Sequence, residues 1–223
     1  MKQLLTRLSL FIALFITLGA KGQHTITVKH TYYTLEYDTL LKSPLISWYI
    51  QTTAHATSDV KIERKSVSSF HQDPLIDAKY QVATNNEYKN NGHYDKGHLS
   101  PYSAFYFDLM AAKESMYYTN TAPQYSFFNR HSWERLEQYV LKVLSPEHDS
   151  IYVYTGCLYG NNKMNDVPVP DFYWKVIEYK NGEECWLGPN EETNSTDYSS
   201  YHISSEALKQ KIKTYYPNLY FPF

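Results

Sequence analysis

One amphipathic helical segment limits what this chain can fold into more than any other feature. The sequence SWERLEQYVLKVL, at 132–144, repeats large apolar residues every three or four positions: Trp133, Leu136, Val140 and Val143. This spacing predicts a helix with one buried face, and Ser145-Pro146 is expected to end it. Whatever surrounds this helix must offer it an apolar surface, and the segments on both sides of it read as strands.

Alternating apolar and polar residues predict strands at 31–40 and 44–51. Three further segments, 150–156, 169–179 and 183–190, also look like strands. A second helix is expected at 204–216, with Ser204 or Ser205 as its N-cap. Strands on both sides of a central helix predict an α+β fold in which a mixed, mainly antiparallel β-sheet is flanked by helices.

The first 22 residues have the layout of a secretory signal peptide. Two basic residues, Lys2 and Arg7, lead into an eleven-residue apolar run from Leu8 to Leu18 and then into small residues. A membrane-spanning helix needs about 20 apolar residues, so we expect residues 1–22 to be removed and 23–223 to form one secreted or periplasmic domain. An uncleaved N-terminal anchor is the alternative. We expect no membrane association after cleavage.

The charge of the chain excludes binding of nucleic acid by a general positive field. The formal net charge is −2, and loss of the leader leaves 18 Lys and Arg against 23 Asp and Glu, a net charge of −5. A protein that holds DNA mainly by its overall charge is strongly basic instead. If the substrate is a polyanion, a local cleft and a metal ion must supply the attraction.

The cysteines and the tyrosines each allow two interpretations. Export would permit a disulfide between Cys157 and Cys185, and a pair of buried thiols fits as well; no spacing of Cys and His suits structural zinc. The 23 tyrosines could stack on bases or sugars, although tyrosines usually fill the margins of a β-rich core.

The stretch YDKGHLSP, at 94–101, carries the first candidate for catalysis. Gly97 permits a tight turn or a close approach to a ligand, and Pro101 favours an extended residue before it. An imidazole on such a segment, His98, could take a proton from water near neutral pH. In a chain with nine histidines, His98 alone would more simply be a surface or packing residue.

Neutral oxygen ligands and a carboxylate follow downstream. Asn120 and Asn129 precede the predicted helix, and Glu137 lies on it, eight residues after Asn129. Eight helical residues rise about 12 Å, too far for both side chains to hold one ion directly, so Glu137 would act through water. Magnesium suits this arrangement because it keeps several of its waters. Asn129 could instead be the helix N-cap, although Ser132 is also available for that role.

Read together, three stretches resemble the DNA/RNA non-specific endonucleases, the ββα-metal or His-Me finger group that includes mitochondrial endonuclease G. They are Asp95-Lys96-Gly97-His98, then Asn120-Thr121-Ala122-Pro123-Gln124, then Asn129 to Glu137. The likeness continues through YVYTG, VPDFYWKVI and LGPN and covers nearly all of the mature chain. It implies a ββα-metal active site within the α+β fold.

The resemblance also implies roles for the matched residues. His98 would be the general base that activates water, and Asn129 would hold one Mg²⁺ ion directly, with Mn²⁺ as the alternative metal. Glu137 would orient metal-bound water, Asn120 would support the site by hydrogen bonding, and Lys96 would contact phosphate. The implied activity is hydrolysis of DNA and RNA to 5′-phosphates with little sequence preference. We expect a monomer or a homodimer.

Two departures from the family pattern motivate a second hypothesis. Lys96 replaces the usual arginine and so keeps the charge without the planar bidentate fork. Many members also carry an arginine just ahead of a Phe-x-x-Asp segment, whereas here Val67 to Ser69 precede Phe70 to Asp73 and Arg64 lies further back. The alternative is therefore a catalytically weakened homologue that binds nucleic acid or another extracellular polymer without cleaving it.

Overall fold

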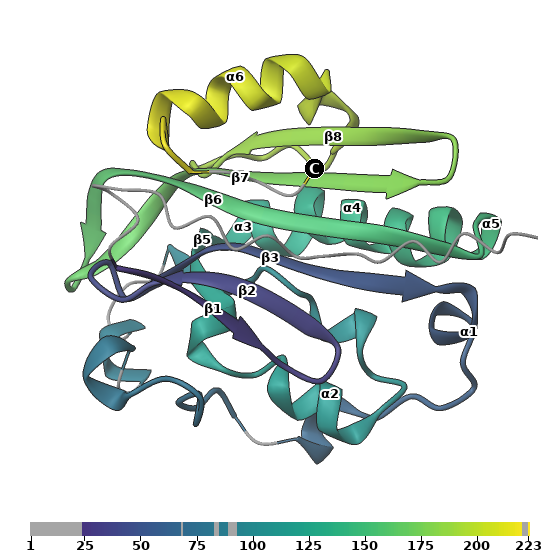
Figure 1. The fold of residues 1–223 in the computed structure, drawn as a ribbon, viewed down its shortest axis with the longest axis horizontal. Coiled ribbons are helices and arrows are strands. Elements are labelled where there is room, and N and C mark those ends of the chain that lie inside the picture. Colours follow the sequence, from purple (N-terminus) through teal and green to yellow (C-terminus); the bar gives the residue numbers. More distant parts are fainter. Residues whose placement is uncertain (1–23, 68, 83–84, 89–92, 220–222) are drawn as a thin grey trace, which may run out of the picture.

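A computed structural model of the chain describes all residues except 1–23, 68, 83–84, 89–92 and 220–222. Its main feature is a seven-stranded sheet in which each strand is antiparallel to its neighbours (Figure 1). In spatial order the strands are β1 (Thr25–Lys29), β2 (Tyr33–Asp38), β3 (Ser43–Thr52), β6 (Ser150–Met164), β7 (Val167–Tyr179), β8 (Gly182–Pro189) and β9 (His202–Ile203). The expected α+β class is confirmed.

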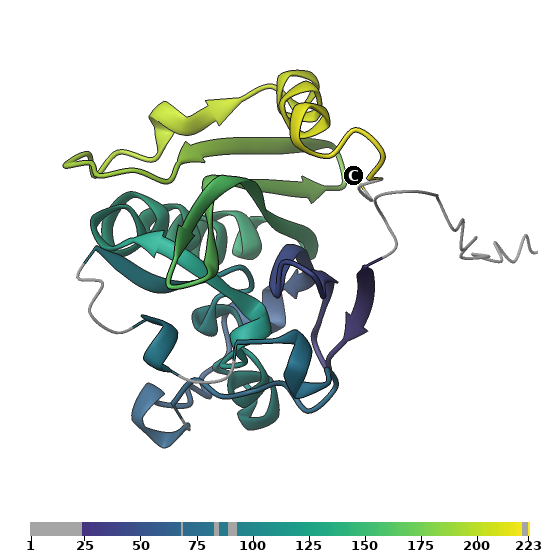
Figure 2. The same cartoon turned by 90° about the vertical axis from the view of Figure 1, so that its left-hand side faces the viewer.

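Helices cover both faces of this sheet. The C-terminal helix α6 (Ser205–Tyr215) lies over one face, and the teal helical run α3 to α5 lies over the other (Figures 1 and 2). The alternation along β6 explains the two layers, because Val153 faces the core under the helical run and Tyr154 faces the core under α6. Ser204 caps α6 by accepting a hydrogen bond from the backbone N–H of Ala207, as predicted.

The long helix differs from its prediction at both ends. It runs without a break from 126 to 147, as α3 (Ser126–Phe128), α4 (Glu134–Tyr139) and α5 (Ser145–Glu147) joined by two π-helical turns, Asn129–Trp133 and Val140–Leu144. Its predicted apolar face is buried at Trp133, Leu136 and Val140, but Val143 is exposed.

Neither Asn129 nor Ser132 caps the helix, and Pro146 does not end it. Asn129 has helical dihedrals and Ser132 is buried within the helix, where its hydroxyl donates to the Phe128 carbonyl at 3.5 Å. Tyr125 precedes the first turn without a side-chain cap, so the sequence carries no start signal there. Pro146 follows a π-helical turn that has already left the regular hydrogen-bond pattern, so its missing N–H breaks no regular bond.

A second, two-stranded sheet leads into this helix. Strands β4 (Tyr94–His98) and β5 (Thr121–Tyr125) are antiparallel, with Lys96 opposite Pro123 and His98 opposite Thr121. The two strands and the helix that follows make a β-β-α unit, which packs beside β7 through a hydrogen bond from the Tyr173 hydroxyl to the Ala122 carbonyl, 2.9 Å long. The unit therefore carries all three matched stretches of sequence.

Short helices and turns complete the described chain. They are α1 (Thr53–Ala56) and α2 (Leu109–Glu114), with 3₁₀ turns at Arg64–Ser66, Ala78–Tyr80, Asn85–Tyr88, Tyr102–Ala104, Tyr118–Asn120 and Ser199–Tyr201. None of the helices in the described ranges is long and apolar enough to cross a membrane. The predicted signal peptide, residues 1–22, lies outside the described residues.

The two cysteines are buried free thiols. Cys157 lies on β6 and Cys185 on β8, with β7 between them, so two strand spacings alone separate their backbones by about 10 Å, beyond the roughly 7 Å that a disulfide spans. They are also offset along the strands, since Cys157 lies opposite Tyr173 and Cys185 opposite Val176. They also face opposite cores. Of the two states that the sequence leaves open, the structure shows the pair of thiols.

Candidate active site

The β-β-α unit brings three of the sequence-predicted residues to one cavity. His98 from the end of β4 and Asn129 and Glu137 from the helix line a cavity of about 250 Å³. His98 and Asn129 also line an adjoining cavity of about 370 Å³, together with Lys96 and Arg64. Asn120 lines neither cavity and lies behind the site.

His98 is placed where it stays neutral. Burial, with the positive charges of Arg64 and Lys96, lowers the pKa of His98 to about 3. Its Nε2 atom is shielded from solvent and has no hydrogen-bond partner among the described residues. The ring packs against Phe70, with 5.1 Å between the ring centroids. At pH 7 the imidazole is thus the free base, with a nitrogen available to a ligand.

Asp95 fixes the side chain of Asn129. The Asn129 amide donates from Nδ2 to Asp95 Oδ2 at 2.9 Å, and the Arg130 guanidinium donates to both carboxylate oxygens at 2.8 and 2.6 Å. Ser126 adds a further hydrogen bond at 3.1 Å. Although burial opposes ionisation, the contacts with Arg130, Asn129 and Ser126 lower the pKa of Asp95. Because Nδ2 is engaged, the Oδ1 atom of Asn129 is left for a ligand.

Asn120 holds the chain just after His98. Its amide donates to the Ser100 carbonyl at 2.8 Å and to the Ser115 carbonyl at 3.0 Å, and its Oδ1 atom accepts from the Ser100 N–H at 3.0 Å. The side chain is fully buried. Asn120 therefore fixes the position of the segment that carries the imidazole and does not reach the cavity itself.

Glu137 has a buried counter-charge that the sequence reading missed. Lys175 on β7 lies under the helix, where its Nζ atom donates to Thr155 Oγ1 at 2.5 Å and lies 5.3 Å from the Trp133 ring centre. Burial raises the pKa of Glu137 to about 7, and the Lys175 ammonium opposes that rise. The sequence contains one signal for this residue: Lys175 is a charged residue in the middle of a mostly apolar predicted strand, VPDFYWKVIEY.

Of the cations that line the second cavity, two pack on aromatic rings. The guanidinium of Arg64 lies 5.2 Å from the Phe70 ring centre and 4.9 Å from that of Tyr102. Lys96 Nζ lies 5.2 Å from the Phe70 ring centre and 4.9 Å from that of Tyr88. Arg64, on the 3₁₀ turn Arg64–Ser66, thus brings a guanidinium to this cavity although no arginine directly precedes Phe70 in the sequence.

The donor set fits a hydrated hard cation. Within the described ranges no group of three or more His, Cys, Asp and Glu side chains could enclose a metal ion. The cavity instead offers oxygens of two amides, Asn129 and Gln138, and of two carboxylates, Glu134 and Glu137, and of these Asn129 is the one whose amide Asp95 orients. Mg²⁺ is commonly held in this way, through one or two protein oxygens and several waters.

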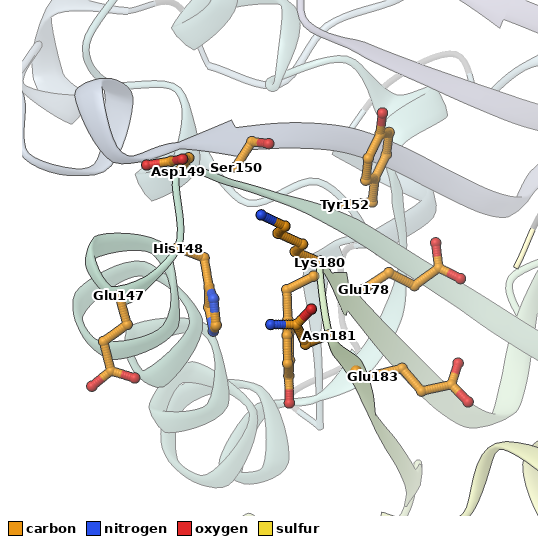
Figure 3. Close-up of a pocket in the computed structure, with 11 residues that line it drawn as sticks. Glu147, His148, Asp149, Ser150, Tyr152, Glu178, Lys180, Asn181 and Glu183 are labelled. Atoms are coloured by element: carbon orange, nitrogen blue, oxygen red, sulfur yellow. The ribbon is translucent and has the colours of Figure 1, made fainter.

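The largest cavity described does not suit a polyanion. It has a volume of about 920 Å³ and lies at the other end of the sheet, between α5 and the β7–β8 turn (Figure 3). Its lining includes four carboxylates, those of Glu147, Asp149, Glu178 and Glu183, and these point in different directions in Figure 3. The single lining lysine, Lys180, does not balance them, so nucleic acid would be repelled there.

Comparison with known proteins agrees with the fold and the site described above. Residues 14–218 match the family described as DNA/RNA non-specific endonuclease. The chain belongs to this family. Within the family fold, the β-β-α unit, the neutral His98 and the adjacent Asn129 make up the candidate active site.

Individual relatives are nucleases. Nuclease C1 of Cunninghamella echinulata var. echinulata is 27% identical over 158 residues, which are 65% of this chain and 58% of that protein. The mitochondrial nuclease of Saccharomyces cerevisiae is 32% identical over 98 residues, 44% of this chain and 29% of that protein. The Serratia marcescens nuclease is 23% identical over 206 residues, 85% and 74% of the two chains. The chain thus spans less than two thirds of the first two relatives.

A solved structure supports the fold. A chain in the crystal structure of the EndoG/EndoGI complex superposes with a TM-score of 0.74 at 26% sequence identity, covering 87% of this chain and 84% of that one. The similarity extends over the main sheet as well as the β-β-α unit, because no smaller segment would account for that coverage. The expected ββα-metal nuclease fold is confirmed.

Proposed function

We propose that this member of the DNA/RNA non-specific endonuclease family is a metal-dependent endonuclease that hydrolyses phosphodiester bonds of DNA and RNA with little sequence preference. One observation carries the proposal: the free-base imidazole of His98 and the oriented amide of Asn129 line one cavity beside two cations. A phosphodiester requires a proton acceptor for the attacking water and positive charge against its oxygens, and this cavity has both.

Each residue of the site has a task in this mechanism. His98 accepts the proton of the attacking water, and Arg64 and Lys96 hold the phosphate oxygens. A phosphate bound between these cations offsets the positive charge that lowers the pKa of His98, so substrate binding makes the imidazole a stronger base. Asn120 and Asp95 act indirectly by fixing the His98 segment and the Asn129 amide.

The metal assignment follows from the donor set. Asn129 Oδ1 would hold the cation, and the Glu137 carboxylate would accept hydrogen bonds from water around it. When bound, Mg²⁺ supplies charge against the phosphate and the departing 3′ oxygen. Mg²⁺ is the proposed metal and Mn²⁺ the alternative, since both favour oxygen ligands.

Cleavage of plasmid DNA and of a structured RNA, each with Mg²⁺, tests the proposal. The wild-type chain should cleave both, and His98→Ala should lower the rate by about 10²- to 10⁴-fold, the usual contribution of a general base. His131→Ala is the matched control, because His131 stacks on Phe127 outside both cavities. A folded wild-type chain that binds but cuts neither substrate with Mg²⁺ or Mn²⁺ would instead favour the alternative of a non-cleaving homologue.

Secretion or a periplasmic location is part of the proposal and rests on residues 1–22. The basic start and the eleven-residue apolar run support it. Mass spectrometry of the exported protein should show a chain that begins at Gln23. An intact N-terminus in the membrane fraction would support the uncleaved anchor.

A further inference from the structure

A third cavity adjoins the candidate active site and has different chemistry. It has a volume of about 390 Å³, and Tyr94 lines both it and the cavity that holds His98, Lys96 and Arg64. Its remaining walls are mainly rings and small apolar side chains: Tyr125, Phe172, Val169, Pro170 and Pro189. The two cavities therefore meet at a tyrosine.

Tyr94 and Tyr125 form the shared wall. They lie directly opposite one another on β4 and β5, and their ring centroids are 4.5 Å apart at an interplanar angle of 52°. Both side chains are half-buried, so each ring keeps part of its surface exposed. A half-exposed aromatic pair at the mouth of a cavity is a surface on which a planar ring can stack.

The two cavities differ in charge and therefore suit different parts of a nucleotide. Arg64, Lys96 and Arg130 line the second cavity, whereas the described residues of the third include Asp171 and Glu191 and neither Lys nor Arg. A phosphate is attracted to the second cavity and repelled from the third. An uncharged base is not repelled and gains apolar contact there.

The polar groups of the third cavity are mostly engaged within the protein. Asn190 donates to the carbonyls of Pro123 and Pro170 at 3.0 and 2.9 Å, and its oxygen accepts from the Tyr125 N–H at 2.8 Å. Asp171 accepts from the Tyr215 hydroxyl at 2.9 Å. With these groups occupied, recognition would depend on stacking and would distinguish the four bases weakly.

Strand β4 sets the spacing between the two cavities. Alternate residues of a strand share a face, so Tyr94, Lys96 and His98 follow one another at steps of roughly 6.6 Å. A ring surface, a cation and a proton acceptor therefore lie in a row. A nucleotide whose base rests on Tyr94 would extend its phosphate toward Lys96 and the imidazole.

From this arrangement we propose that the cavity between Tyr94 and Phe172 binds a nucleobase of the substrate strand, stacked on the Tyr94–Tyr125 pair. The proposal rests on the endonuclease function proposed above and specifies its substrate. A base in this cavity is withdrawn from pairing with a second strand. The protein therefore acts preferentially on single-stranded or locally unpaired nucleic acid.

Steady-state cleavage of two single strands of equal length tests the proposal. One carries bases, and the other carries abasic tetrahydrofuran residues on the same phosphates. The wild-type chain should show the lower KM for the strand with bases. Tyr94→Ala should shrink the ratio of the two KM values by roughly tenfold or more, because loss of one stacking contact weakens binding about that much, whereas Tyr94→Phe should keep the ratio.

Two further variants serve as controls. Tyr94→Leu keeps apolar packing without an aromatic face and should behave like Tyr94→Ala, which separates stacking from folding. Tyr152→Ala removes an exposed tyrosine on the far cavity and should leave the ratio unchanged. Equal KM values for the two strands in the wild-type chain, or an unchanged ratio in Tyr94→Leu, would overturn the nucleobase site.

Binding without divalent cation separates this inference from the proposed function. Fluorescence anisotropy of a labelled single strand should show weaker binding by Tyr94→Leu than by Tyr94→Phe, even if the wild-type chain cleaves nothing. Loss of cleavage with this difference intact would count against the nuclease and not against the base site. Equal affinities of the two variants would refute the base site whatever the activity.

Discussion

At the scale of single residues, the site depends on side chains that orient other side chains. The Asp95 carboxylate, on β4, holds the first helical turn through Asn129, Arg130 and Ser126. An amide can present either its oxygen or its nitrogen, and the Asp95 carboxylate accepts only the nitrogen end. Asp95 thus decides that Asn129 offers an oxygen to a cation.

Asp95→Ala should weaken divalent-cation binding. Removing a group that orients a metal ligand typically lowers affinity 10- to 100-fold. The free Mn²⁺ signal in electron paramagnetic resonance measures this directly. Ser126→Ala is the control, since it removes a hydroxyl that donates to Asp95 Oδ1, keeps the Ser126 carbonyl that accepts from the Asn129 N–H, and leaves the bond between Asp95 Oδ2 and the Asn129 side chain intact. Wild-type affinity in Asp95→Ala would show that Asn129 needs no external orientation.

The sequence pattern assigned no role to Arg64. Its guanidinium packs on Phe70 and Tyr102 beside the cavity of His98. Arg64→Ala should lower kcat by roughly 10²- to 10³-fold, the cost of losing one donor to a developing negative charge. Arg64→Lys should recover only part of this rate, because an ammonium has no planar fork.

The neighbouring Lys65 supplies the control for that measurement. It lies on the same 3₁₀ turn, is exposed and pairs with Glu63 at 2.7 Å, away from the cavity. Lys65→Ala should keep kcat within about twofold, since exposed pairs contribute little. Equal losses in the two alanine variants would mean that Arg64 acts only through the general charge of this surface.

At the scale of elements, the close pairing of β4 and β5 positions the segment that carries His98. A Cβ atom added at Gly97 would lie 2.2 Å from Gln124 Oε1 and 2.6 Å from Gln124 Cβ. Only glycine permits the two strands to approach this closely. The glycine before His98 therefore serves the packing of the strand pair, and this packing sets where the imidazole lies.

Gly97→Ala should destabilise the fold as well as the site. Overpacking of this kind costs about 1–3 kcal/mol of unfolding free energy, measured by urea denaturation, and should lower cleavage too. Gly182→Ala is the control, because its nearest neighbour is the Tyr179 ring at 3.1 Å on an exposed turn. Equal stability of the two variants would contradict the role assigned to Gly97.

The elements also show what the sequence could predict. The strands at 169–179 and 183–190 were correct to within two residues, because both are rich in aromatic and apolar residues and Asn181-Gly182 marks the turn between them. The helix start was six residues off, since Tyr125 and Ser126 carry no capping signal. The motifs predicted that His98, Asn129 and Glu137 would lie at one site, and they line one cavity. The sequence marks Lys175 as unusual, but neither its place nor that of Arg64 could be predicted, because only tertiary packing brings β7 and the 64–66 turn to the site.

At the scale of the whole molecule, a buried charge ties the N-terminal strands to the loop that carries Phe70. Asp73 Oδ2 lies 3.1 Å from His30 Nε2, which follows β1, and accepts from the Thr119 hydroxyl at 2.7 Å. Burial opposes ionisation, but the contacts with His30, Leu75 and Thr119 lower the pKa of Asp73. The Phe70 segment, which packs against the His98 ring, is thereby anchored to the main sheet.

Asp73→Asn should lower the unfolding free energy at pH 7 by roughly 2–4 kcal/mol, since it removes a buried charge from its partners. The folded pKa lies below the unfolded value of about 4, so this stabilisation is complete above pH 4 and is lost as the pH falls through the folded pKa. Urea denaturation of both proteins between pH 7 and pH 2 should therefore show the difference shrinking below pH 4. A constant difference across that range would contradict the assignment.

The central claim is that one hydrated cation and one neutral imidazole share a cavity in this fold. Anomalous diffraction from crystals soaked in Mn²⁺ tests it most directly. The account predicts a peak about 2.2 Å from Asn129 Oδ1, within the cavity of His98 and Glu137, that is absent in Asn129→Ala. A Mn²⁺ peak only among the carboxylates of the far cavity, or the same peak beside residue 129 after the substitution, would contradict it.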